Sequence, residues 1–345
     1  MKAAILKAPG HLILEEVAMP LCPEGGLVVK TRACSICSTD VKMFQRGHRA
    51  LAYPRILGHE VTGVVVESRA SAGMFKAGDR VQIFPGICCG QCPACQRGAD
   101  NQCEHISIIG FSHDGGFTEF LGVPAQSVAS GGVNLIPDGL SYEEASLAEP
   151  LASCLNGQQL AGVSEGDSVL ILGAGPIGLL HAMLARVNGA SPVLVTERLP
   201  ARLKVAWPVH IDRMIDIERE SVEVVVQEET RGRGVDVILT ACSEATVSSL
   251  PRLLAPKGRL CLFSGLPPEK AGILFDANLI HYRELTVVGA YGSTAAQNSA
   301  ALTLIASGKV PVAWLITSRL SLGEIQKGME YVAKREGLKT VITFS

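Results

Sequence analysis

The hydrophobic positions of this chain change their rhythm near residue 164. In residues 1–148 they come in short runs, such as 27–29, 64–66 and 81–84, which Gly, Pro and Asp residues separate. Short apolar runs between turn-forming residues predict β-strands. The first part of the chain is therefore predicted to be β-rich, beginning with two strands around a turn at Pro9-Gly10.

Beyond residue 164 the pattern predicts strands that alternate with helices. Strands are predicted at 168–172, 192–196, 235–240, 259–263 and 285–288, with a helix at 177–188. This alternation is typical of a parallel sheet covered by helices on both faces. The tail predicts helices at 295–307 and 322–334 and a last strand at 339–344. The expected fold class is α/β, with two domains.

Composition narrows the function classes. The 345 residues are 47% hydrophobic and 19% charged, with a net charge of −2, which argues against disorder and against a basic surface for nucleic acid. The most apolar stretch, 168–185, is broken by three glycines and Pro176 and is too short for a typical membrane span. Together with the absence of a recognisable signal segment, this predicts a cytoplasmic protein with neither a membrane nor a nucleic acid as partner.

Cysteines are concentrated in one segment. Of the 11, Cys89, Cys92, Cys95 and Cys103 follow the spacing C-x2-C-x2-C-x7-C, with Cys88 as an additional neighbour. An odd total argues against complete disulfide pairing, whereas this spacing lets four thiolates surround one ion. We expect a structural zinc site without an open coordination position. An iron–sulfur centre and a metal-free redox module are the competing interpretations.

A glycine loop follows the first strand of the second half. Gly173, Gly175 and Gly178 form G-x-G-x-x-G between a predicted strand and a predicted helix, which is the context of a dinucleotide-binding turn. Glu197, at the end of the next strand, could accept hydrogen bonds from the ribose hydroxyls and so favours NAD over NADP. Arg198 or Arg202 could instead bind a 2′-phosphate, which keeps NADP open.

Three further segments contain residues that can bind a metal: Cys37-Ser38-Thr39-Asp40, Gly58-His59-Glu60 and Glu149-Pro150. Each has an ordinary structural explanation when taken alone. In this order, with the cysteine cluster, the glycine loop and the segments around Gly78-Asp79 and His281, they make the whole chain resemble the zinc-containing medium-chain dehydrogenase/reductase family. Glu149-Pro150 stands where ethanol-type members have a cysteine, as in the sorbitol and threonine dehydrogenase branch.

The resemblance implies a domain organisation. Residues 1–148 would form a GroES-like catalytic domain with the structural zinc lobe at about 88–103, where the four cysteines cluster. Residues 149–292 would form a Rossmann domain with a doubly wound parallel sheet, and residues 293–345 would return to the catalytic domain. The protein would be a homo-oligomer, a tetramer or a dimer, with two zinc ions per chain.

The resemblance also assigns roles to individual residues. Cys37, His59 and Glu149 would bind a catalytic zinc, with Glu60 as an intermittent ligand or a neighbour of the ligands. An alcohol bound to this ion would ionise and pass hydride to the nicotinamide. Thr39 would accept the alcohol proton. Lys42 stands where relatives often continue the proton relay with a histidine, so Lys42, His48 or water would take that part. The cofactor would contact Gly173, Gly175, Pro176, Ile177, Gly178, Glu197, Arg202, Ser264 and Gly265.

The expected function is therefore an NAD-dependent oxidation of a secondary alcohol to a ketone, on a polyol, cyclitol, sugar or amino alcohol. An L-threonine 3-dehydrogenase is the alternative within the same chemistry. A zinc protein that binds the nucleotide without catalysis is the alternative outside it.

Overall fold

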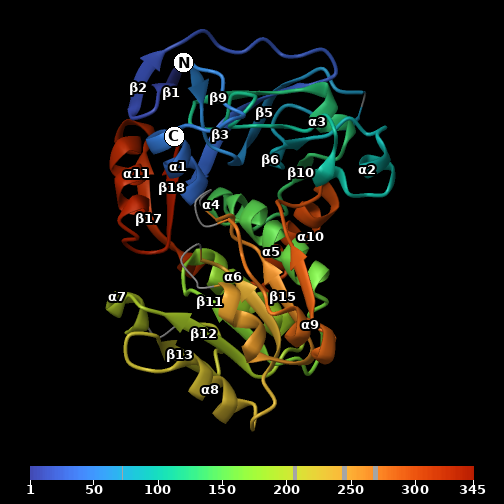
Figure 1. Ribbon diagram of the computed structural model, residues 1–345. Coiled ribbons are helices and arrows are strands. Elements are labelled where there is room, and N and C mark those ends of the chain that lie inside the picture. The colour runs from blue at the N-terminus through green and yellow to red at the C-terminus, as the bar shows by residue number, and fades with distance from the viewer. Residues whose placement is uncertain (72, 205–207, 243–246, 267–270) are drawn as a thin grey trace. The chain divides into compact units, whose positions relative to one another are not determined.

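The computed structural model describes residues 1–345 except 72, 205–207, 243–246 and 267–270 (Figure 1). By its contacts the chain divides into two compact units. The first unit contains Met1–Ala152 and Ser293–Ser345, and the second contains Ser153–Gly292. The two ends of the chain therefore fold together, and the intervening segment forms a unit of its own.

The first unit is built on β-sheets, as the short apolar runs predict. A small sheet has the strand order β2-β1-β4, and a larger one has the order β10-β6-β5-β3-β18-β17 with β9 paired to β3. The short β7 and β8 pair with each other. The strands are β1 (Lys2–Ala8), β2 (His11–Glu16), β3 (Leu27–Ile36), β4 (Arg55–Ile56), β5 (Glu60–Ser68), β6 (Arg80–Ile83), β7 (Gly86–Ile87), β8 (Ser107–Ile108), β9 (Phe120–Val123), β10 (Val133–Leu135), β17 (Ile316–Ser321) and β18 (Lys339–Thr343).

The C-terminal strand β18 lies next to β3, although some 300 residues separate them in sequence. It pairs antiparallel with β3, with Thr340 opposite Ile36, while β5 pairs with the other edge of β3, with Glu60 opposite Ser35. Figure 1 shows the red C-terminal elements beside the blue β3 and α1. The predicted strand at 339–344 is confirmed, and it brings the end of the chain to the end of β3.

Helices complete the first unit. The predicted helix at 295–307 is confirmed, and the one predicted at 322–334 begins with a 3-10 turn, Leu322–Glu324, before its α-helical part. The helices are α1 (Ser38–Arg46), α2 (Pro93–Gln96), α3 (Ala125–Ala129), α4 (Tyr142–Ser146), α5 (Ala148–Ala161), α10 (Ala295–Ala306) and α11 (Ile325–Ala333). The boundary between the two units falls inside α5, between Ala152 and Ser153.

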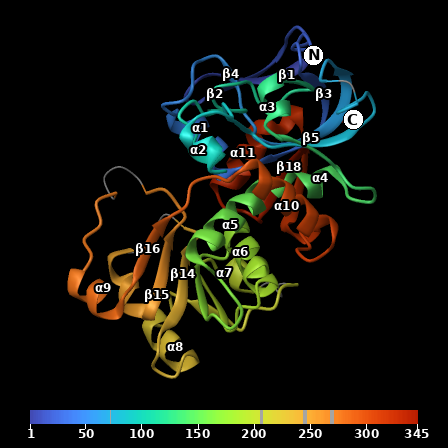
Figure 2. The same cartoon turned by 90° about the vertical axis from the view of Figure 1, so that its right-hand side faces the viewer.

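The second unit contains one six-stranded parallel sheet. Its order is β13-β12-β11-β14-β15-β16, which, counted along the chain, is the 3-2-1-4-5-6 order of a doubly wound dinucleotide-binding sheet. Figure 2 shows β14, β15 and β16 side by side, with α9 beyond β16. The strands are β11 (Val169–Leu172), β12 (Val193–Glu197), β13 (Arg213–Asp216), β14 (Val235–Thr240), β15 (Leu254–Leu262) and β16 (Thr286–Gly289).

The helices of this unit are α6 (Pro176–Val187), α7 (Pro200–Leu203), α8 (Val222–Glu229) and α9 (Ala277–Arg283). The predicted helix at 177–188 corresponds to α6, whose residues 178–185 are all buried. The sequence pattern did not predict β13, because its four residues include Arg213 and Asp216 and do not form an apolar run. Among the described residues, no helix is both long and apolar enough to span a bilayer.

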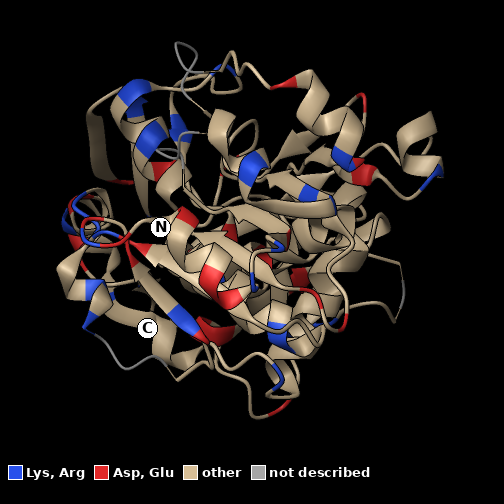
Figure 3. Cartoon of the chain, turned by 60° about the horizontal axis from the view of Figure 1, so that its bottom comes forward, with Lys and Arg blue, Asp and Glu red and all other residues tan. Residues whose placement is uncertain are grey.

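Positively and negatively charged residues are distributed together along the chain. Figure 3 shows Lys and Arg interspersed with Asp and Glu on the elements that face the viewer. This agrees with 31 basic and 33 acidic residues in the whole sequence.

Candidate metal centres and nucleotide-binding loop

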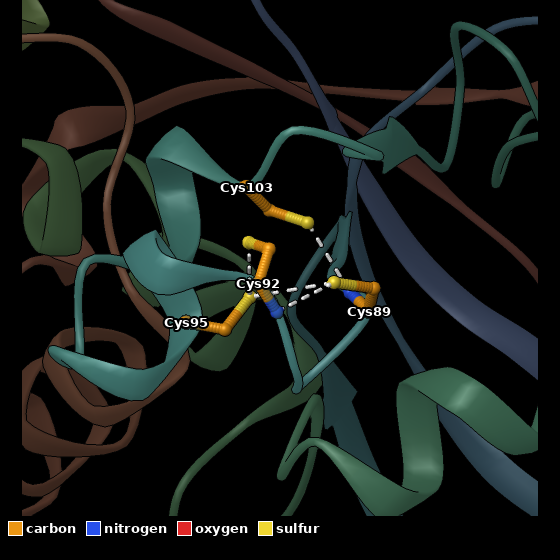
Figure 4. Close-up of side chains that lie close together, drawn as sticks. All are labelled: Cys89, Cys92, Cys95 and Cys103. Carbon is orange, nitrogen blue, oxygen red and sulfur yellow. Dashed lines mark hydrogen bonds between the residues drawn. The ribbon is translucent and has the colours of Figure 1, made fainter.

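The four clustered cysteines converge on one point in the first unit. Their sulfur atoms all lie within 4.8 Å of one another, with Sγ–Sγ distances of 3.5 Å for Cys92–Cys95 and 4.0 Å for Cys89–Cys95 (Figure 4). A tetrahedral zinc with bonds of about 2.3 Å would place its sulfur ligands about 3.8 Å apart. The geometry therefore fits one zinc ion held by four thiolates.

Backbone amides donate hydrogen bonds to sulfur atoms of this cluster, although burial raises the pKa of the Cys95 and Cys103 thiols. Cys103 Sγ accepts hydrogen bonds from the N–H groups of Cys89 and His105, at 3.2 and 3.3 Å, and Cys89 Sγ accepts one from Cys92 at 3.3 Å. Hydrogen bonds from the backbone amides of Cys95 and Glu104 lower the pKa of the Cys92 thiol to about 6. Cys88, the additional neighbour, is buried but lies outside this four-residue cluster.

A second group lies at the ends of β3 and β5. Potential ligand atoms of Cys37, His59 and Glu60 also lie within 4.8 Å of one another. Cys37 follows β3 and is the N-cap residue of α1, while Glu60 begins β5. Because β3 and β5 are neighbouring antiparallel strands, the end of one meets the start of the other, and that pairing brings the three residues together.

Asp40 organises this second group. Its Oδ1 lies 3.2 Å from His59 Nδ1 and accepts a hydrogen bond from the Gly58 N–H at 3.3 Å. Its Oδ2 accepts the Cys37 N–H at 2.9 Å. Burial would lower the pKa of His59, but the Asp40 carboxylate and the Cys37 side chain raise it well above its usual value. With Nδ1 held by Asp40, Nε2 is the ring nitrogen available to a metal.

Two carboxylates stand in different relations to this group, because Glu60 belongs to it and Glu149 does not. Both oxygens of the fully buried Glu60 contact the ammonium of Lys339, Oε1 at 2.7 Å and Oε2 more closely. Glu149, in the first turn of α5, is not part of the compact group of three. Burial raises the pKa of Glu149 to about 7, while the charge of His59 opposes that shift. Glu149 therefore lies within electrostatic range of His59, Glu60 and Lys339.

Asp40 and Lys339 were missed as site residues by the sequence analysis. Asp40 stands in the Cys37 segment, and its spacing of three residues from an N-cap is the signal that could have indicated it. Lys339 has no such local signal. A lysine in a predicted strand reads as a surface residue until the position of β18 beside β3 is known.

Thr39 and Lys42, predicted to move the alcohol proton, lie on α1. Thr39 is half-buried in the first turn, and the Lys42 side chain is exposed. Residues three apart share one face of a helix, so Lys42 follows Thr39 toward solvent.

The glycine loop joins β11 to α6 as the motif predicts. Gly173 has φ +102°, a conformation that favours glycine, and Gly175 is the N-cap residue of α6, with Pro176 and Ile177 in its first turn. A Cβ on Gly178 would lie 1.8 Å from the Gly173 carbonyl oxygen. Close packing of strand and helix therefore requires a glycine at 178, and the start of α6 presents free backbone N–H groups suited to phosphates.

Glu197 and Arg202 lie beside this loop. Glu197 Oε1 accepts hydrogen bonds from the N–H groups of Arg198 and Leu199, at 2.7 and 2.9 Å, and its Oε2 lies 3.6 Å from Arg202 Nη1. The same Arg202 nitrogen is 3.2 Å from the position that a Cβ on Gly175 would take. The acidic and the basic candidate for cofactor recognition are thus adjacent to each other and to the loop.

Ser264 and Gly265 follow β15 at the carboxyl edge of the parallel sheet. The Ser264 N–H donates to the Thr240 carbonyl at 3.2 Å, which ties the end of β15 to the end of β14. A Cβ on Gly265 would meet no atom of the described residues within 4 Å. Ligands of doubly wound sheets bind at this edge.

Comparison with known proteins gives consistent matches over the chain. Residues 23–135 match the family model of the alcohol dehydrogenase GroES-like domain, and residues 176–307 match that of the zinc-binding dehydrogenases. The chain is 30% identical to an L-galactonate-5-dehydrogenase of Escherichia coli (strain K12), over 100% of this chain and 99% of the relative. It is 38% identical to an L-threonine 3-dehydrogenase of Pyrococcus furiosus, over 89% of this chain and 87% of the relative.

A solved structure is similar over nearly the whole length. A zinc-binding dehydrogenase from Sinorhizobium meliloti 1021, bound to NADP, has a TM-score of 0.91 and 32% sequence identity, and the match covers 99% of each chain. The expected fold class, a GroES-like domain with a Rossmann-type domain, is thereby confirmed.

Proposed function

Because this chain belongs to the family of zinc-type medium-chain alcohol dehydrogenases, and is thus an oxidoreductase, we propose that it oxidises a secondary alcohol of a polyol, cyclitol, sugar or amino alcohol to a ketone, with NAD as hydride acceptor. The observation that carries this proposal is the convergence of Cys37, His59 and Glu60 beside the ordering carboxylate of Asp40.

The residues at this point fit a catalytic zinc. A thiolate, an imidazole and a carboxylate are the ligand types of zinc sites that keep one position open for substrate. Cys37 and His59 would hold the ion together with Glu149, with Glu60 next to them. Zinc bound there would supply a Lewis acid that polarises the alcohol oxygen. A second zinc would be structural, held by the four clustered cysteines, which gives two per chain.

Thr39 would accept the alcohol proton, and Lys42 would pass it to solvent. The support is their shared face on α1 and the exposure of Lys42, which water can reach. Lys42→Ala should shift the pH–rate profile of alcohol oxidation, because the exit of the proton would then depend on water or on His48. An unchanged profile would remove Lys42 from the relay.

NAD is proposed as the cofactor because the carboxylate of Glu197 is buried beside the loop. The 2′-phosphate of NADP would have to approach this carboxylate and would be repelled by it. The neighbouring Arg202 and the NADP bound to the Sinorhizobium meliloti protein keep NADP as the competing cofactor. Glu197→Gln should reduce the preference for NAD over NADP, measured as the ratio of the two kcat/KM values, by about tenfold or more, or about 1.4 kcal/mol. Arg202→Gln is the matched variant and should weaken NADP use more than NAD use.

The decisive experiment measures NAD reduction on protein of known zinc content. The panel contains polyols, cyclitols, sugar acids, sugar phosphates and L-threonine. Two zinc ions per chain and turnover of one polyol-like substrate would support the proposal. One zinc ion per chain and no turnover of the panel would refute it.

An L-threonine 3-dehydrogenase is the second candidate. It is favoured by the 38% identity to the Pyrococcus furiosus enzyme, which exceeds the 30% identity to the L-galactonate enzyme, although over a shorter part of the chain. Oxidation of L-threonine with a kcat/KM above that of every polyol tested would select this candidate.

A homo-oligomer, a dimer or a tetramer, is proposed through the β16 edge of the second unit. β16 ends the six-stranded sheet, and large apolar side chains are exposed in the segment of chain that precedes it, among them Leu274 at 87% and Tyr282 at 79%. An uncovered edge strand with apolar surroundings is suited to pairing with a second copy. Leu274→Asp should lower the molar mass measured by light scattering, whereas Leu21→Asp, equally exposed in the first unit, should not.

The cytoplasm is the proposed location. The structure places none of the 11 cysteines in a disulfide, and the proposed zinc sites need five of them reduced. Fractionation of cells should find the protein with the cytoplasmic markers.

A further inference from the structure

The segment that joins the candidate ligands Cys37 and His59 is positively charged, and the proposed mechanism uses only one of its cations. Residues 41–58 contain four cationic side chains and no carboxylate: Lys42, Arg46, Arg49 and Arg55. The first three of these side chains are exposed, and Arg55 is half-buried. A substrate bound at the candidate metal site therefore lies beside a segment of one charge sign.

A turn fixes the part of this segment that follows α1. Gly47, the residue after the helix, has φ +75°, which favours glycine. The Leu51 N–H donates to the His48 carbonyl oxygen at 3.0 Å and closes a turn that contains Arg49. Leu51 is half-buried and packs against the core of the first unit. The backbone that carries His48 and Arg49 is thus anchored to the fold.

Phe111 connects this turn to the candidate metal site. The centroid of its ring lies 5.4 Å from that of His59 and 5.5 Å from that of His48, and both pairs make edge contacts. The imidazole of a candidate metal ligand and the imidazole of the turn therefore lie against the same buried phenyl ring. One aromatic side chain separates the turn from the place where the substrate hydroxyl would bind.

His48 and Arg49 offer two kinds of group to a ligand. His48 Nδ1 accepts the Ala50 N–H at 3.2 Å, so the neutral imidazole carries its hydrogen on Nε2. Partial burial and the charge of Arg49 lower the pKa of His48, which favours this neutral form. The effect of Arg49 also places its charge within electrostatic range of the imidazole. An N–H donor beside a guanidinium suits a negatively charged oxygen group.

The carboxylates that stand closest to this segment are already engaged. Asp114 Oδ1 lies 2.9 Å from Arg55 Nη1 and accepts the Ile56 N–H at 3.1 Å. The buried Asp40 accepts hydrogen bonds within the candidate metal site, as described above. Among the ion pairs of the described residues, none engages Arg49. Uncompensated positive charge beside a site attracts negatively charged ligands.

We propose that Arg49, together with the Nε2–H of His48, binds an acidic group of the substrate. The alcohol that is oxidised would then be a polyhydroxylated carboxylic acid or phosphate ester rather than a neutral polyol. Both present anionic oxygens to which a guanidinium can donate two parallel hydrogen bonds. The acidic group would be joined by a short carbon chain to the carbon that is oxidised. This inference rests on the proposed function and names the substrate class of the same site.

The test compares substrates that differ only in one terminal group. Each hexitol of the gluco, galacto, manno and ido series is assayed beside its hexonate and its terminal phosphate ester, on the full-length zinc-loaded protein. We expect the acidic member of one series to have a kcat/KM about tenfold or more above that of its neutral hexitol, chiefly through a lower KM. The hexonate and phosphate arms identify the acidic group. Titration calorimetry of the preferred acid, without cofactor, gives a dissociation constant that does not depend on turnover.

Variants assign the preference to this turn. Arg49→Gln should lower the ratio of the two kcat/KM values, acid over hexitol, by about fivefold or more, because it removes a charge-assisted contact. The value for the neutral hexitol should stay within about twofold. Arg49→Lys keeps the charge and should retain most of the preference. Arg69→Gln, which changes an exposed arginine after the far end of β5, is the matched control and should alter neither value.

His48→Leu removes the proposed donor and should also lower this ratio and weaken binding of the acid in calorimetry. The ratio is the appropriate measure, because any effect of His48 on proton transfer acts on both substrates alike. Added NaCl should weaken binding of the acid more than binding of the hexitol, since salt screens the charge of Arg49.

Equal kcat/KM values for the acids and their neutral hexitols would overturn the inference, and so would L-threonine, whose net charge is zero, as the best substrate. An Arg49→Gln protein that keeps the full preference for the acid would overturn it as well. Oxidation of a neutral hexitol by a protein with two zinc ions, together with such a result, would leave the proposed function standing. One zinc ion per chain and no turnover of any of these compounds would overturn both.

Discussion

The carboxylate of Asp40 orders both His59 and Cys37. Its Oδ1 lies 3.2 Å from His59 Nδ1, and its Oδ2 accepts the Cys37 N–H at 2.9 Å, while Asp40 itself is fully buried. One side chain thus sets the orientation of the imidazole and the start of α1, from which Cys37 extends. The two candidate ligands are preorganised by a residue that does not bind the metal itself.

Asp40→Asn should therefore weaken metal binding at this site. Asparagine has one uncharged acceptor oxygen, so it cannot accept hydrogen bonds from His59 and from Cys37 on two separate oxygens as Asp40 does. Loss of a carboxylate that orders a metal ligand costs about 10- to 100-fold in metal affinity. Competition with a chelator measures the zinc dissociation constant. Asp79→Asn is the control, because Asp79 accepts a backbone N–H in an exposed turn. Equal zinc affinity in the wild type and Asp40→Asn would contradict the proposed arrangement.

Cys92→Ser should remove the structural zinc and leave the catalytic one. Cys92 Sγ lies 3.5 Å from Cys95 Sγ within the cluster of four, so its loss leaves three thiolates. A structural zinc site contributes to folding directly, and the variant should melt at a lower temperature. Zinc content by mass spectrometry and thermal unfolding are measured together. Cys88→Ser, which changes a buried cysteine outside the cluster, should keep both ions, and a Cys92→Ser protein with undiminished zinc would refute the assignment.

Gly178→Ala should destabilise the second unit and abolish nucleotide binding. The new Cβ would lie 1.8 Å from the Gly173 carbonyl oxygen, a backbone atom that cannot move without distorting the loop. Overpacking of this kind typically costs about 1–3 kcal/mol or more. Urea unfolding and NAD titration provide the measurements. Gly265→Ala adds the same methyl group where no atom of the described part of the chain lies within 4 Å, so its stability should equal that of the wild type. Tight NAD binding by Gly178→Ala would argue against the proposed cradle.

His181 should make the protein less stable in mild acid. Burial lowers the pKa of His181 in the folded chain to about 3. The centroid of its ring lies 4.7 Å from the centroid of the Phe263 ring. The unfolded value is about 6.5, so this contribution to stability is complete above about pH 6.5. It is lost by up to about 1.4 kcal/mol per pH unit as the pH falls toward 3, because the unfolded state then binds the proton.

His181→Leu tests this dependence. The loss of unfolding free energy between pH 7 and pH 5 should be about 2 kcal/mol smaller in the variant than in the wild type. Urea unfolding at the two pH values gives the comparison, and replacement of the exposed His281 serves as control. The same pH dependence in His181→Leu and wild type would show that His181 does not set it.

Much of the local structure was predictable. The short apolar runs predicted β3, β5 and β6, and the glycine spacing predicted the β11–α6 turn, because these signals depend on residues that are neighbours in sequence. β13 was not predicted, because its four residues do not form an apolar run. Its strand conformation comes from backbone pairing with β12. The four cysteines were predictable as a cluster because a short loop holds them all.

The sequence by itself determined the fold class, the cysteine cluster and the glycine loop, each through a local pattern. It also pointed to Cys37 and His59 as separate segments, which the resemblance to the family joined into one expected metal site. The tertiary structure alone decided what surrounds them: Asp40 fixes the imidazole, Glu60 belongs to the compact group, and Glu149 does not. Lys339 reaches Glu60 because β18 pairs with β3, a contact between residues 279 apart in sequence. Such contacts come from strand order, which a local sequence pattern does not specify.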